Sequence, residues 1–599
     1  MKKLMLFLAA VLLPQPGLGT PAVRLHLKPP PGLQTPEPLM FMLSPQGTPP
    51  GAYNSGGGGG GGTNFGASTV IVNGGAGGLS GTSGFGTTAN VRYFVAANDT
   101  ETAELNPTAA NITVEMAPGV TIRQLTGSTN LFHLGNGANN FTIRGGGLST
   151  VSSGTCAPLV VDTPATPVNN ITLDNVELNA NSSTCTDSGA GFVNISGGSH
   201  HSLDVWSPAA SDHIIVIDNS TPATHNPISD VTITTRHGDL VESSATGIAI
   251  KLCPNNQPGG TAPISLVNID ATVQTADTGF KGGWNCNGLG PIDSHVKMRI
   301  SLTGSLGNDA MFSGSCAAHC QFDVIVDDNG IEAFGGGIIM NDSADFTING
   351  IVHETNSSSL MPFQALDSRN FTVNLNAGGD TNTISITPVN GWSTTQPCMQ
   401  IGTTTGQVIG NITIGNVRCL MPPSSTADCL DVFTSGANNP VVDNLTITPG
   451  LKCLGASGAG SKGISLTNTA TGGSQSFANA VINNPWIRNF VTGLSIGAGV
   501  NQTQVNGALI TGATTPVSDS GTNSRIWTHR VQTTGTLASG TLAVTFSGND
   551  VWTGATTYSC NGSDQTTVTN AVSFTYTSAT AMTITGTASD VIRYQCWGY

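Results

Sequence analysis

The sequence predicts an all-β protein in which a long solenoid of stacked coils precedes a small antiparallel β-sandwich domain. A four-residue phrase that recurs along the middle of the chain carries this prediction. Each copy has a turn-forming Asn or Asp, an apolar residue, a Thr and then a β-branched or large apolar residue. The copies lie at residues 111–114, 140–143, 170–173, 230–233, 345–348, 370–373, 411–414 and 444–447, at intervals of 29, 30, 60, 115, 25, 41 and 33 residues.

The alternation within the phrase has the two-residue period of a strand that buries one face. One strand–bend–strand unit cannot bury its apolar face alone, so stacked copies must form a continuous core. Intervals of 25 to 41 residues suit one coil, the interval of 60 suits two coils, and the interval of 115 suits several degenerate ones. We expect the degenerate strands at residues 213–217, 296–302 and 322–326.

The Asn at the head of each copy has a structural role at a corner of the coil. Asn tolerates left-handed backbone angles and hydrogen-bonds to its own backbone at bends. Stacked at one corner of successive coils, these residues are expected to form ladders of side-chain amides. The same residues create many Asn-x-Thr tripeptides, which are formal glycosylation acceptors. The solenoid alone explains their number.

The N-terminal region predicts export. Lys2 and Lys3 precede an apolar run over residues 4–13, which is typical of a signal peptide, and we assign residues 1–20 to it. A short hydrophobic anchor of a virion protein is the alternative. Residues 21–90 are rich first in Pro and then in Gly, a composition typical of a tether. No later run is long and apolar enough to cross a bilayer, so we expect a secreted, cell-surface or virion-borne protein.

The strand phrase resembles that of right-handed parallel β-helix proteins, whose members include pectate lyases, polygalacturonases and phage tailspikes. The resemblance covers residues 91–520 and implies that fold for the solenoid. It does not select a function, because this solenoid carries both enzymes and binding proteins. The polygalacturonase motifs are matched poorly and in the wrong order by residues 268–270, 327–328, 236–238 and 299–301.

Residues 521–599 form the predicted C-terminal domain. The phrase is replaced there by hairpin-like alternation, for example at residues 542–546, 572–576, 582–585 and 591–597. The stretch 585–596 resembles a terminal module of some bacterial surface proteins and phage fibres. Such a module has three candidate roles, namely capping the open end of the solenoid, assembling a homotrimer or binding a receptor.

Composition and cysteine content agree with an extracellular β-protein. Only 9% of residues are charged, and 35 acidic against 20 basic residues give a net charge of −15, which argues against nucleic acid as a partner. The 12 cysteines suit an oxidising compartment and predict disulfides. Cys560 and Cys596 are expected to pair with each other. Cys316 and Cys320, with His319 between them, favour a disulfide over zinc, because no second close pair follows.

Hydrolysis of a glycosidic bond needs two carboxylates that flank it. Acidic residues are densest between residues 323 and 354, and the candidate catalytic residues are Asp327, Asp328, Glu332, Asp342 and Glu354. If 322–326 and 346–348 are matching strands one coil apart, such carboxylates would stack about 5 Å apart, and repulsion would raise one pKa. The alternatives are an ordinary turn at residues 327–330 and a calcium site, calcium being the one cofactor considered. His237, Asp239 and Glu242 form a second, weaker cluster.

The candidate substrate-binding residues are Trp284, His319 and His353. Trp206, Trp284, Trp392 and Trp486 fall outside the repeated phrase and are expected on loops, where Trp commonly stacks on sugar rings. The leading functional hypothesis is recognition of a surface polysaccharide in the manner of a tailspike or adhesin, with or without cleavage. A free exported polysaccharide lyase or glycoside hydrolase is the alternative, and a structural cell-surface protein is the third.

Overall fold

A computed structural model gives the fold. It describes residues 68–125, 129–150, 157–162, 166–179, 191–210, 213–219, 226–243, 247–253, 263–283, 290–304, 310–328, 334–353, 359–377, 395–404, 407–421, 424–436, 440–455, 458–470, 476–527, 529–546, 552 and 554–598. The predicted signal peptide and most of the predicted tether lie outside these ranges. Among the described residues, no helix is long and apolar enough to span a membrane.

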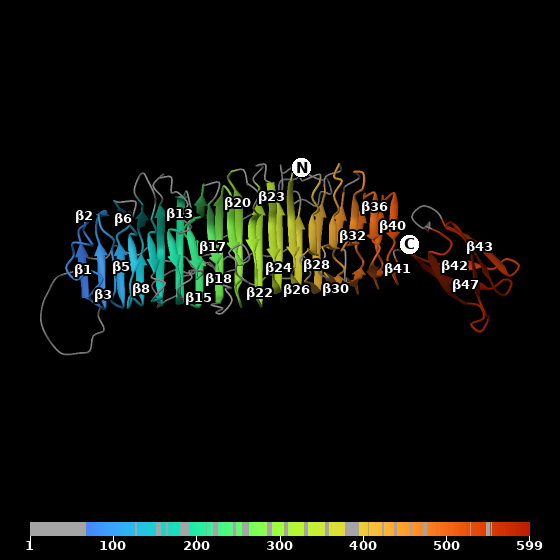
Figure 1. Cartoon of the computed structure of the whole chain (residues 1–599). Helices are drawn as coiled ribbons and strands as arrows, with labels where there is room; N and C mark the ends of the chain where they lie inside the picture. Colours follow the sequence, from blue (N-terminus) through green and yellow to red (C-terminus); the bar gives the residue numbers. More distant parts are fainter. Residues whose placement is uncertain are drawn as a thin grey trace, which may run out of the picture. The chain divides into compact units, whose positions relative to one another are not determined.

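Strands of one long parallel sheet run through the described part of the solenoid (Figure 1). They are β1 (Ser68–Val72), β2 (Gly75–Ala76), β3 (Val91–Val95), β4 (Asp99–Glu101), β5 (Ile112–Met116), β6 (Thr121–Gln124), β8 (Phe141–Arg144), β9 (Gly147–Ser149), β11 (Ile171–Asn179), β13 (Gly198–Ala210), β15 (Ile228–Thr234), β16 (Leu240–Glu242), β18 (Ile264–Thr275), β20 (His295–Leu302), β22 (Cys320–Asp327), β24 (Ala344–His353), β26 (Arg369–Ala377), β28 (Val408–Leu420), β30 (Val441–Ile447), β31 (Lys452–Leu454), β33 (Ser476–Ala478), β34 (Val481–Asn483), β35 (Trp486–Arg488), β37 (Val500–Asn501), β38 (Gln504–Asn506), β39 (Leu509–Thr511) and β41 (Arg525–Trp527).

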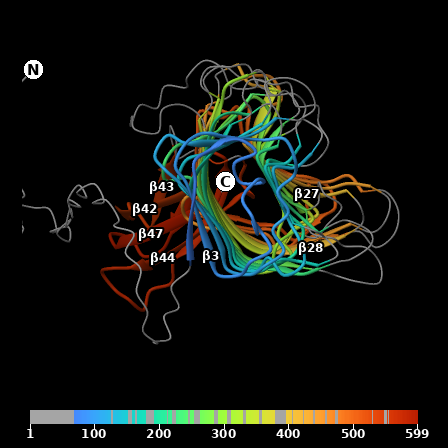
Figure 2. The same cartoon turned by 90° about the vertical axis from the view of Figure 1, so that its left-hand side faces the viewer.

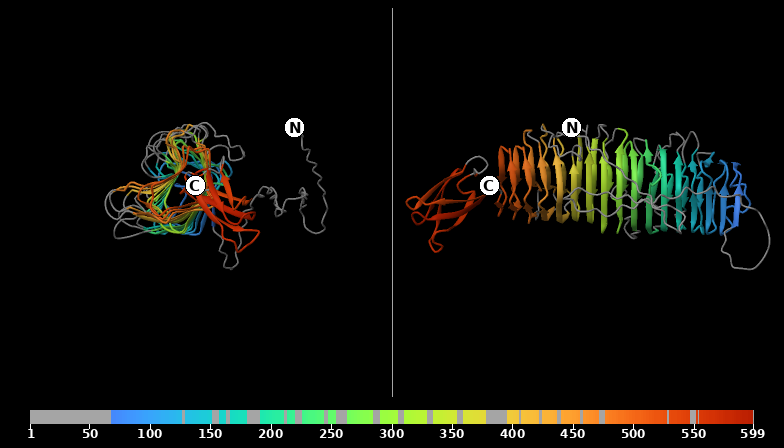
Figure 3. Two further views of the ribbon diagram at one scale, coloured as in Figure 1. Left: turned by 90° about the vertical axis from the view of Figure 1, so that its right-hand side faces the viewer. Right: turned by 180° about the vertical axis from the view of Figure 1, so that it is seen from behind.

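A second parallel sheet takes one strand from each of its coils. Its strands are β7 (Phe132–Leu134), β10 (Val160–Asp162), β12 (Val193–Ile195), β14 (Ile215–Asp218), β17 (Ile248–Cys253), β19 (Thr278–Gly282), β21 (Ala310–Gly314), β23 (Phe334–Asn341), β25 (Ser359–Leu366), β27 (Met399–Thr403), β29 (Leu430–Thr434), β32 (Lys462–Asn468), β36 (Thr492–Ile496) and β40 (Thr515–Asp519). After β6 the chain passes repeatedly between the two sheets, and successive coils superpose when viewed along the stack (Figure 2). The view from behind shows the same order of coils (Figure 3). The predicted parallel β-helix is confirmed.

The register of the long sheet explains the repeated phrase. Thr113 pairs with Thr142, which pairs with Thr172, so the Thr of each copy stacks on the next along the outer face. The apolar residues beside them, such as Ile112 and Phe141, are fully buried. The expected degenerate strands also exist, as β14 in the second sheet and as β20 and β22 in the long sheet.

The predicted corner ladders are confirmed. Asn111, Asn140 and Asn170 have φ of about +60°, and their side-chain amides are linked by hydrogen bonds of 2.7 and 2.6 Å. A second ladder links Asn370 with Asn411 at 2.9 Å and Asn411 with Asn444 at 3.3 Å. The left-handed corner is therefore a property of the coil, and Asn is the side chain that suits it best.

Leu266 occupies the same corner with φ of +53° and is 54% exposed, although a left-handed leucine costs roughly 1–2 kcal/mol. We therefore expect Leu266→Asn to raise the free energy of unfolding by about 1 kcal/mol, measured as a rise in Tm. The reverse substitution Asn140→Leu should lower Tm, because it also removes two amide hydrogen bonds. A Leu266→Asn variant that melts at or below the wild-type temperature would contradict this account.

The solenoid is longer than the sequence indicated. β1 pairs in parallel with β3, so the first described coil begins at Ser68, inside the segment assigned to the tether. At the other end β41 pairs with β38, so parallel pairing continues to Trp527. The sequence did not predict the first coil, because its Gly-rich loop has no apolar alternation. Hydrogen bonds hold this loop in place: the backbone amides of Gly78 and Leu79 donate to the buried carboxylate of Asp99.

The C-terminal module has its own core. Two three-stranded antiparallel sheets consist of β42 (His529–Thr536), β47 (Val591–Gly598) and β44 (Tyr558–Asp564), and of β43 (Thr541–Thr545), β46 (Ala581–Thr585) and β45 (Ser573–Ser578). Trp552 stacks on Tyr558 at 5.1 Å within this core. The predicted disulfide between Cys560 and Cys596 is present.

Candidate functional site

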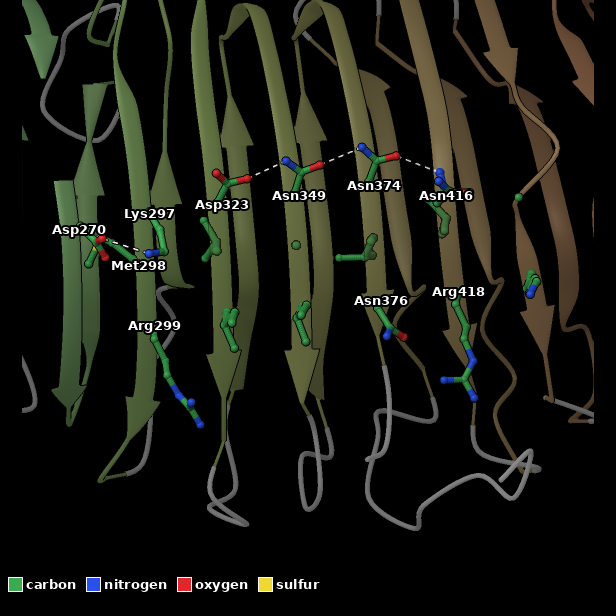
Figure 4. A pocket seen from close by; sticks show the side chains of 18 of the residues that line it. Asp270, Lys297, Met298, Arg299, Asp323, Asn349, Asn374, Asn376, Asn416 and Arg418 are labelled. Atoms are coloured by element: carbon green, nitrogen blue, oxygen red, sulfur yellow. Dashed lines mark hydrogen bonds and ion pairs between the residues drawn. The ribbon is translucent and has the colours of Figure 1, made fainter. Parts of the chain in front are cut away.

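A groove of about 850 Å³ crosses the outer face of the long sheet between β18 and β31. Alternation along each strand sends every second side chain outward, and parallel pairing aligns these side chains in rows that run across the coils. Two such rows line the groove (Figure 4). The groove therefore follows the direction in which the coils stack.

The first row, here called the polar row, contains Asp270, Lys297, Asp323, Asn349 and Asn374 on five successive strands. Lys297 pairs with Asp270 at 3.0 Å. The amide of Asn349 donates to Asp323 at 2.6 Å, and the amide of Asn374 donates to Asn349 at 2.9 Å, so these side chains point toward one another (Figure 4).

Asp323 is ionised at neutral pH. Burial acts to raise its pKa, but hydrogen bonds from Asn349, His295 and Gln321 outweigh burial and leave the pKa below the ordinary value of 3.8. His295 lies 2.9 Å from this carboxylate. The carboxylate of Asp323 thus accepts hydrogen bonds from the amides of Asn349 and Gln321.

The second row, here called the arginine row, contains Arg299, Ile325, Ile351, Asn376 and Arg418 on five successive strands. Lys452 extends the row by one coil as the register partner of Arg418. Trp486 pairs next, and the Lys452 ammonium lies 6.0 Å from the centre of its ring. The row therefore has cations at its ends, with two isoleucines and one asparagine between them.

Asp327 and His353 lie on the same outer face, two residues beyond Ile325 and Ile351 on β22 and β24. They are register partners, and the imidazole Nδ1 is 3.5 Å from a carboxylate oxygen of Asp327. Both side chains are about a quarter exposed. The structure thus brings these two predicted residues together at the border of the groove.

The other predicted catalytic residues do not join this pair. Asp328 is fully buried, so a substrate cannot reach it. Asp342 lies in the turn before β24, whereas Asp327 aligns with the last residue of β24, so the whole length of this strand lies between them. Burial, and then repulsion from Asp367, raises the pKa of Asp342. Glu332, Glu354 and Trp284 lie outside the described residues.

The expected stacking of carboxylates is wrong. β22 and β24 are neighbours as predicted, but Asp323 faces Asn349 and Asp327 faces His353. No carboxylate of β22 is therefore the register partner of a carboxylate of β24, and the expected mutual repulsion does not arise there. Among the described residues, no group of three or more His, Cys, Asp and Glu side chains is arranged to hold a metal ion.

His319 belongs to a second groove, which lies beside the first on the same sheet face and measures about 1120 Å³. It occupies a left-handed corner with φ of +53°, and its Nδ1 is 3.1 Å from Asp293. Cys316 and Cys320 on either side of it form the expected disulfide, so these thiols do not bind zinc. Trp206 and Trp486 lie in strands β13 and β35 and not on loops, while Trp392 is outside the described residues.

Sequence reasoning overlooked the basic side chains of the groove. Lys297 and Arg299 stand two residues apart in a stretch recognised as a strand, so the two-residue period already put them on one face. Arg418 lies in the same strand as the copy of the repeated phrase at residues 411–414, on the outward face. What the sequence lacked was the register that aligns these residues between coils.

No protein-family model and no curated protein matches this chain. Among solved structures, the chain is similar to the catalytic domain of GH87 alpha-1,3-glucanase in complex with nigerose, with 10% identity and a TM-score of 0.26 over 77% of this chain and 69% of that chain. A variant of that domain, also in complex with nigerose, gives 11% identity and the same TM-score and coverage. A TM-score this low carries no argument about this chain, so the fold assignment rests on the strand pairing described above.

Proposed function

We propose that this protein binds an extended extracellular or cell-surface polysaccharide, laid across the coils in the groove formed by the polar row and the arginine row. The observation that carries the proposal is the direction of the groove. It crosses successive coils and presents similar groups at intervals of roughly 4.8 Å, which suits a polymer better than a compact small molecule.

The lining suits sugars. Asn349, Asn374 and Asn376 carry amides that both donate and accept hydrogen bonds, as sugar hydroxyls do. Ile325 and Ile351 offer an apolar floor for the C–H faces of sugar rings, which is the usual mixture in ligand sites. A peptide added as an extra strand is disfavoured, because β20 to β28 are each paired on both sides.

Four disulfides among the described residues support an oxidising, extracellular setting for this activity. Attachment to a virion or a cell surface, in the manner of a tailspike or adhesin, is part of the same proposal. Light scattering of the full chain tests the homotrimer, and removing the residues after Trp527 tests whether the C-terminal module holds it together.

Affinity electrophoresis in gels that contain bacterial surface and plant cell-wall polysaccharides tests binding. We expect Ile351→Asp to weaken binding at least tenfold, or about 1.4 kcal/mol, because it puts a charge on the apolar floor. Ile71→Asp is the matched control, since Ile71 is 66% exposed on β1, outside the groove. Equal retardation of both variants and the wild type would refute this site.

Cleavage of the bound polysaccharide is the second candidate, favoured by the 3.5 Å approach of Asp327 and His353 beside the apolar floor. A carboxylate and an imidazole within reach of one another can hold and transfer a proton. We expect Asp327→Asn to abolish product formation and to retain binding, measured by reducing ends for hydrolysis and by ultraviolet absorbance for elimination. Unchanged turnover in this variant would exclude the pair, and an absence of turnover in the wild type would leave a binding protein.

A further inference from the structure

Some arginines of the long sheet pair with carboxylates and others do not, and Arg299 and Arg418 are the two arginines that line the groove. Arg92, Arg144 and Arg236 each pair with a carboxylate, at 2.7, 3.1 and 3.3 Å. Arg299 and Arg418 form no ion pair or hydrogen bond with any described side chain, yet both line the groove. In a chain with 35 acidic and only 20 basic residues, two guanidinium groups without a described counter-ion in one groove point to an anionic ligand.

One end of the groove concentrates positive charge further. Arg418 and Lys452 are register partners on β28 and β31, so their backbones lie roughly 4.8 Å apart. Like charges directly opposite one another destabilise a sheet, and an anion between them relieves the repulsion. Trp486 beside Lys452 adds an aromatic face on which a sugar ring can pack.

The centre of the groove has the opposite character. Between Arg299 and Arg418 the arginine row carries Ile325, Ile351 and Asn376, and the polar row beside them carries the ionised Asp323. Four inter-strand steps separate the two arginines, or roughly 19 Å. An anionic group over this stretch would meet an apolar floor and a carboxylate, so the negative charges of the ligand must be widely spaced.

We propose that the ligand is an acidic heteropolysaccharide in which carboxylate groups recur with neutral sugars between them. Its acidic groups bind at Arg299 and at the pair of Arg418 and Lys452, and neutral sugars cover Ile325 and Ile351. A homopolymer with a carboxylate on every sugar fits less well, because its charges would fall beside Asp323. This inference rests on the proposed function and adds the chemical class of the ligand.

Four probes test the spacing of charge. Gellan has one glucuronate in each tetrasaccharide repeat, carboxyl-reduced gellan has the same backbone without charge, polygalacturonate has a carboxylate on every sugar, and pullulan has none. Affinity electrophoresis of the full chain should show the strongest retardation by gellan. Arg299→Gln and Arg418→Gln should each weaken gellan binding about tenfold, since each removes a charged hydrogen-bond donor. Arg593→Gln in the C-terminal module, where Arg593 is exposed, is the matched control.

Each outcome is decisive. Equal binding of gellan and carboxyl-reduced gellan, with loss in Ile351→Asp, would overturn the acidic ligand and leave polysaccharide binding intact. Tighter binding of polygalacturonate than of gellan would overturn the wide spacing. A chain that binds none of the four probes would overturn the inference, and the wider panel of polysaccharides would then decide the proposed function by itself. Coincident thermal melts of all variants would show that the losses do not come from misfolding.

Discussion

Replacing Phe322 by Ala should lower the free energy of unfolding by about 3–5 kcal/mol, the usual cost of removing a fully buried aromatic ring. Phe322 is fully buried, with its ring centre 5.8 Å from that of Phe312 and 6.3 Å from that of Phe346. The column continues at both ends, where Phe280 stacks on Phe312 with ring centres 4.7 Å apart and Phe371 stacks on Phe346 with ring centres 4.8 Å apart. The substitution therefore opens a cavity in the middle of a column of rings that spans several coils.

Chemical denaturation followed by circular dichroism measures the loss, and amide hydrogen exchange locates it. Because each coil contacts only its neighbours, exchange should accelerate first in β21 to β24. Val568→Ala is the control, since Val568 is 82% exposed and its truncation should leave stability within about 0.5 kcal/mol of wild type. A loss below about 1 kcal/mol in Phe322→Ala would mean that the column of rings can collapse into the cavity.

Asp162→Asn should make the protein more stable at pH 7 and leave it nearly unchanged at pH 4. Asp162 is fully buried at the end of β10; its Oδ1 accepts the amide of Ser196 at 2.6 Å, and its Oδ2 has no hydrogen bond to a described residue. Burial raises the pKa of this carboxyl from 3.8 to about 6, although hydrogen bonds from Ser196 act to lower it.

The sign of the effect follows from proton linkage. Because folding raises this pKa, the native state holds the proton more tightly, and the stability that the proton contributes is lost as pH rises from about 4 through about 6. The shift corresponds to roughly 3 kcal/mol. The difference in unfolding free energy between Asp162→Asn and wild type should therefore grow by about that amount from pH 4 to pH 7.

Denaturant titrations at closely spaced pH values give this difference directly. Asp270→Asn is the control, because Asp270 is 61% exposed and its pair with Lys297 is worth at most about 1 kcal/mol. If the free energies of unfolding of Asp162→Asn and wild type changed with pH in the same way, the carboxyl of Asp162 would keep its charge in the folded protein.

The repeated phrase was sufficient to predict the solenoid, the strands in its gaps and the Asn ladders. Each of these features repeats from coil to coil and follows from strand alternation and corner geometry, which act over a few positions of the sequence. The same reasoning failed at residues 68–90, where a Gly-rich loop is held by the carboxylates of Asp99 and Glu101. Hydrogen bonds from backbone amides to distant side chains leave no periodic pattern in the sequence.

In the candidate site, too, local sequence patterns predicted only some of the residues that lie together. Density of acidic residues led to Asp327 and His353, which do meet, but also to Asp328 and Asp342, which are buried or distant. The expected stacking of carboxylates failed because register, and not proximity in sequence, selects the partner of each side chain: Asp323 faces Asn349.

For the coils that carry the repeated phrase, the sequence by itself determined which residues form strands and which of their faces is buried, because both follow from a two-residue alternation. Only the tertiary structure decided that Arg299 and Arg418, which stand 119 positions apart, lie in one row of one groove. The physical reason is that the number of residues in each intervening loop sets the register of the next coil. That register, summed over several coils, decides which outward side chains meet a ligand together.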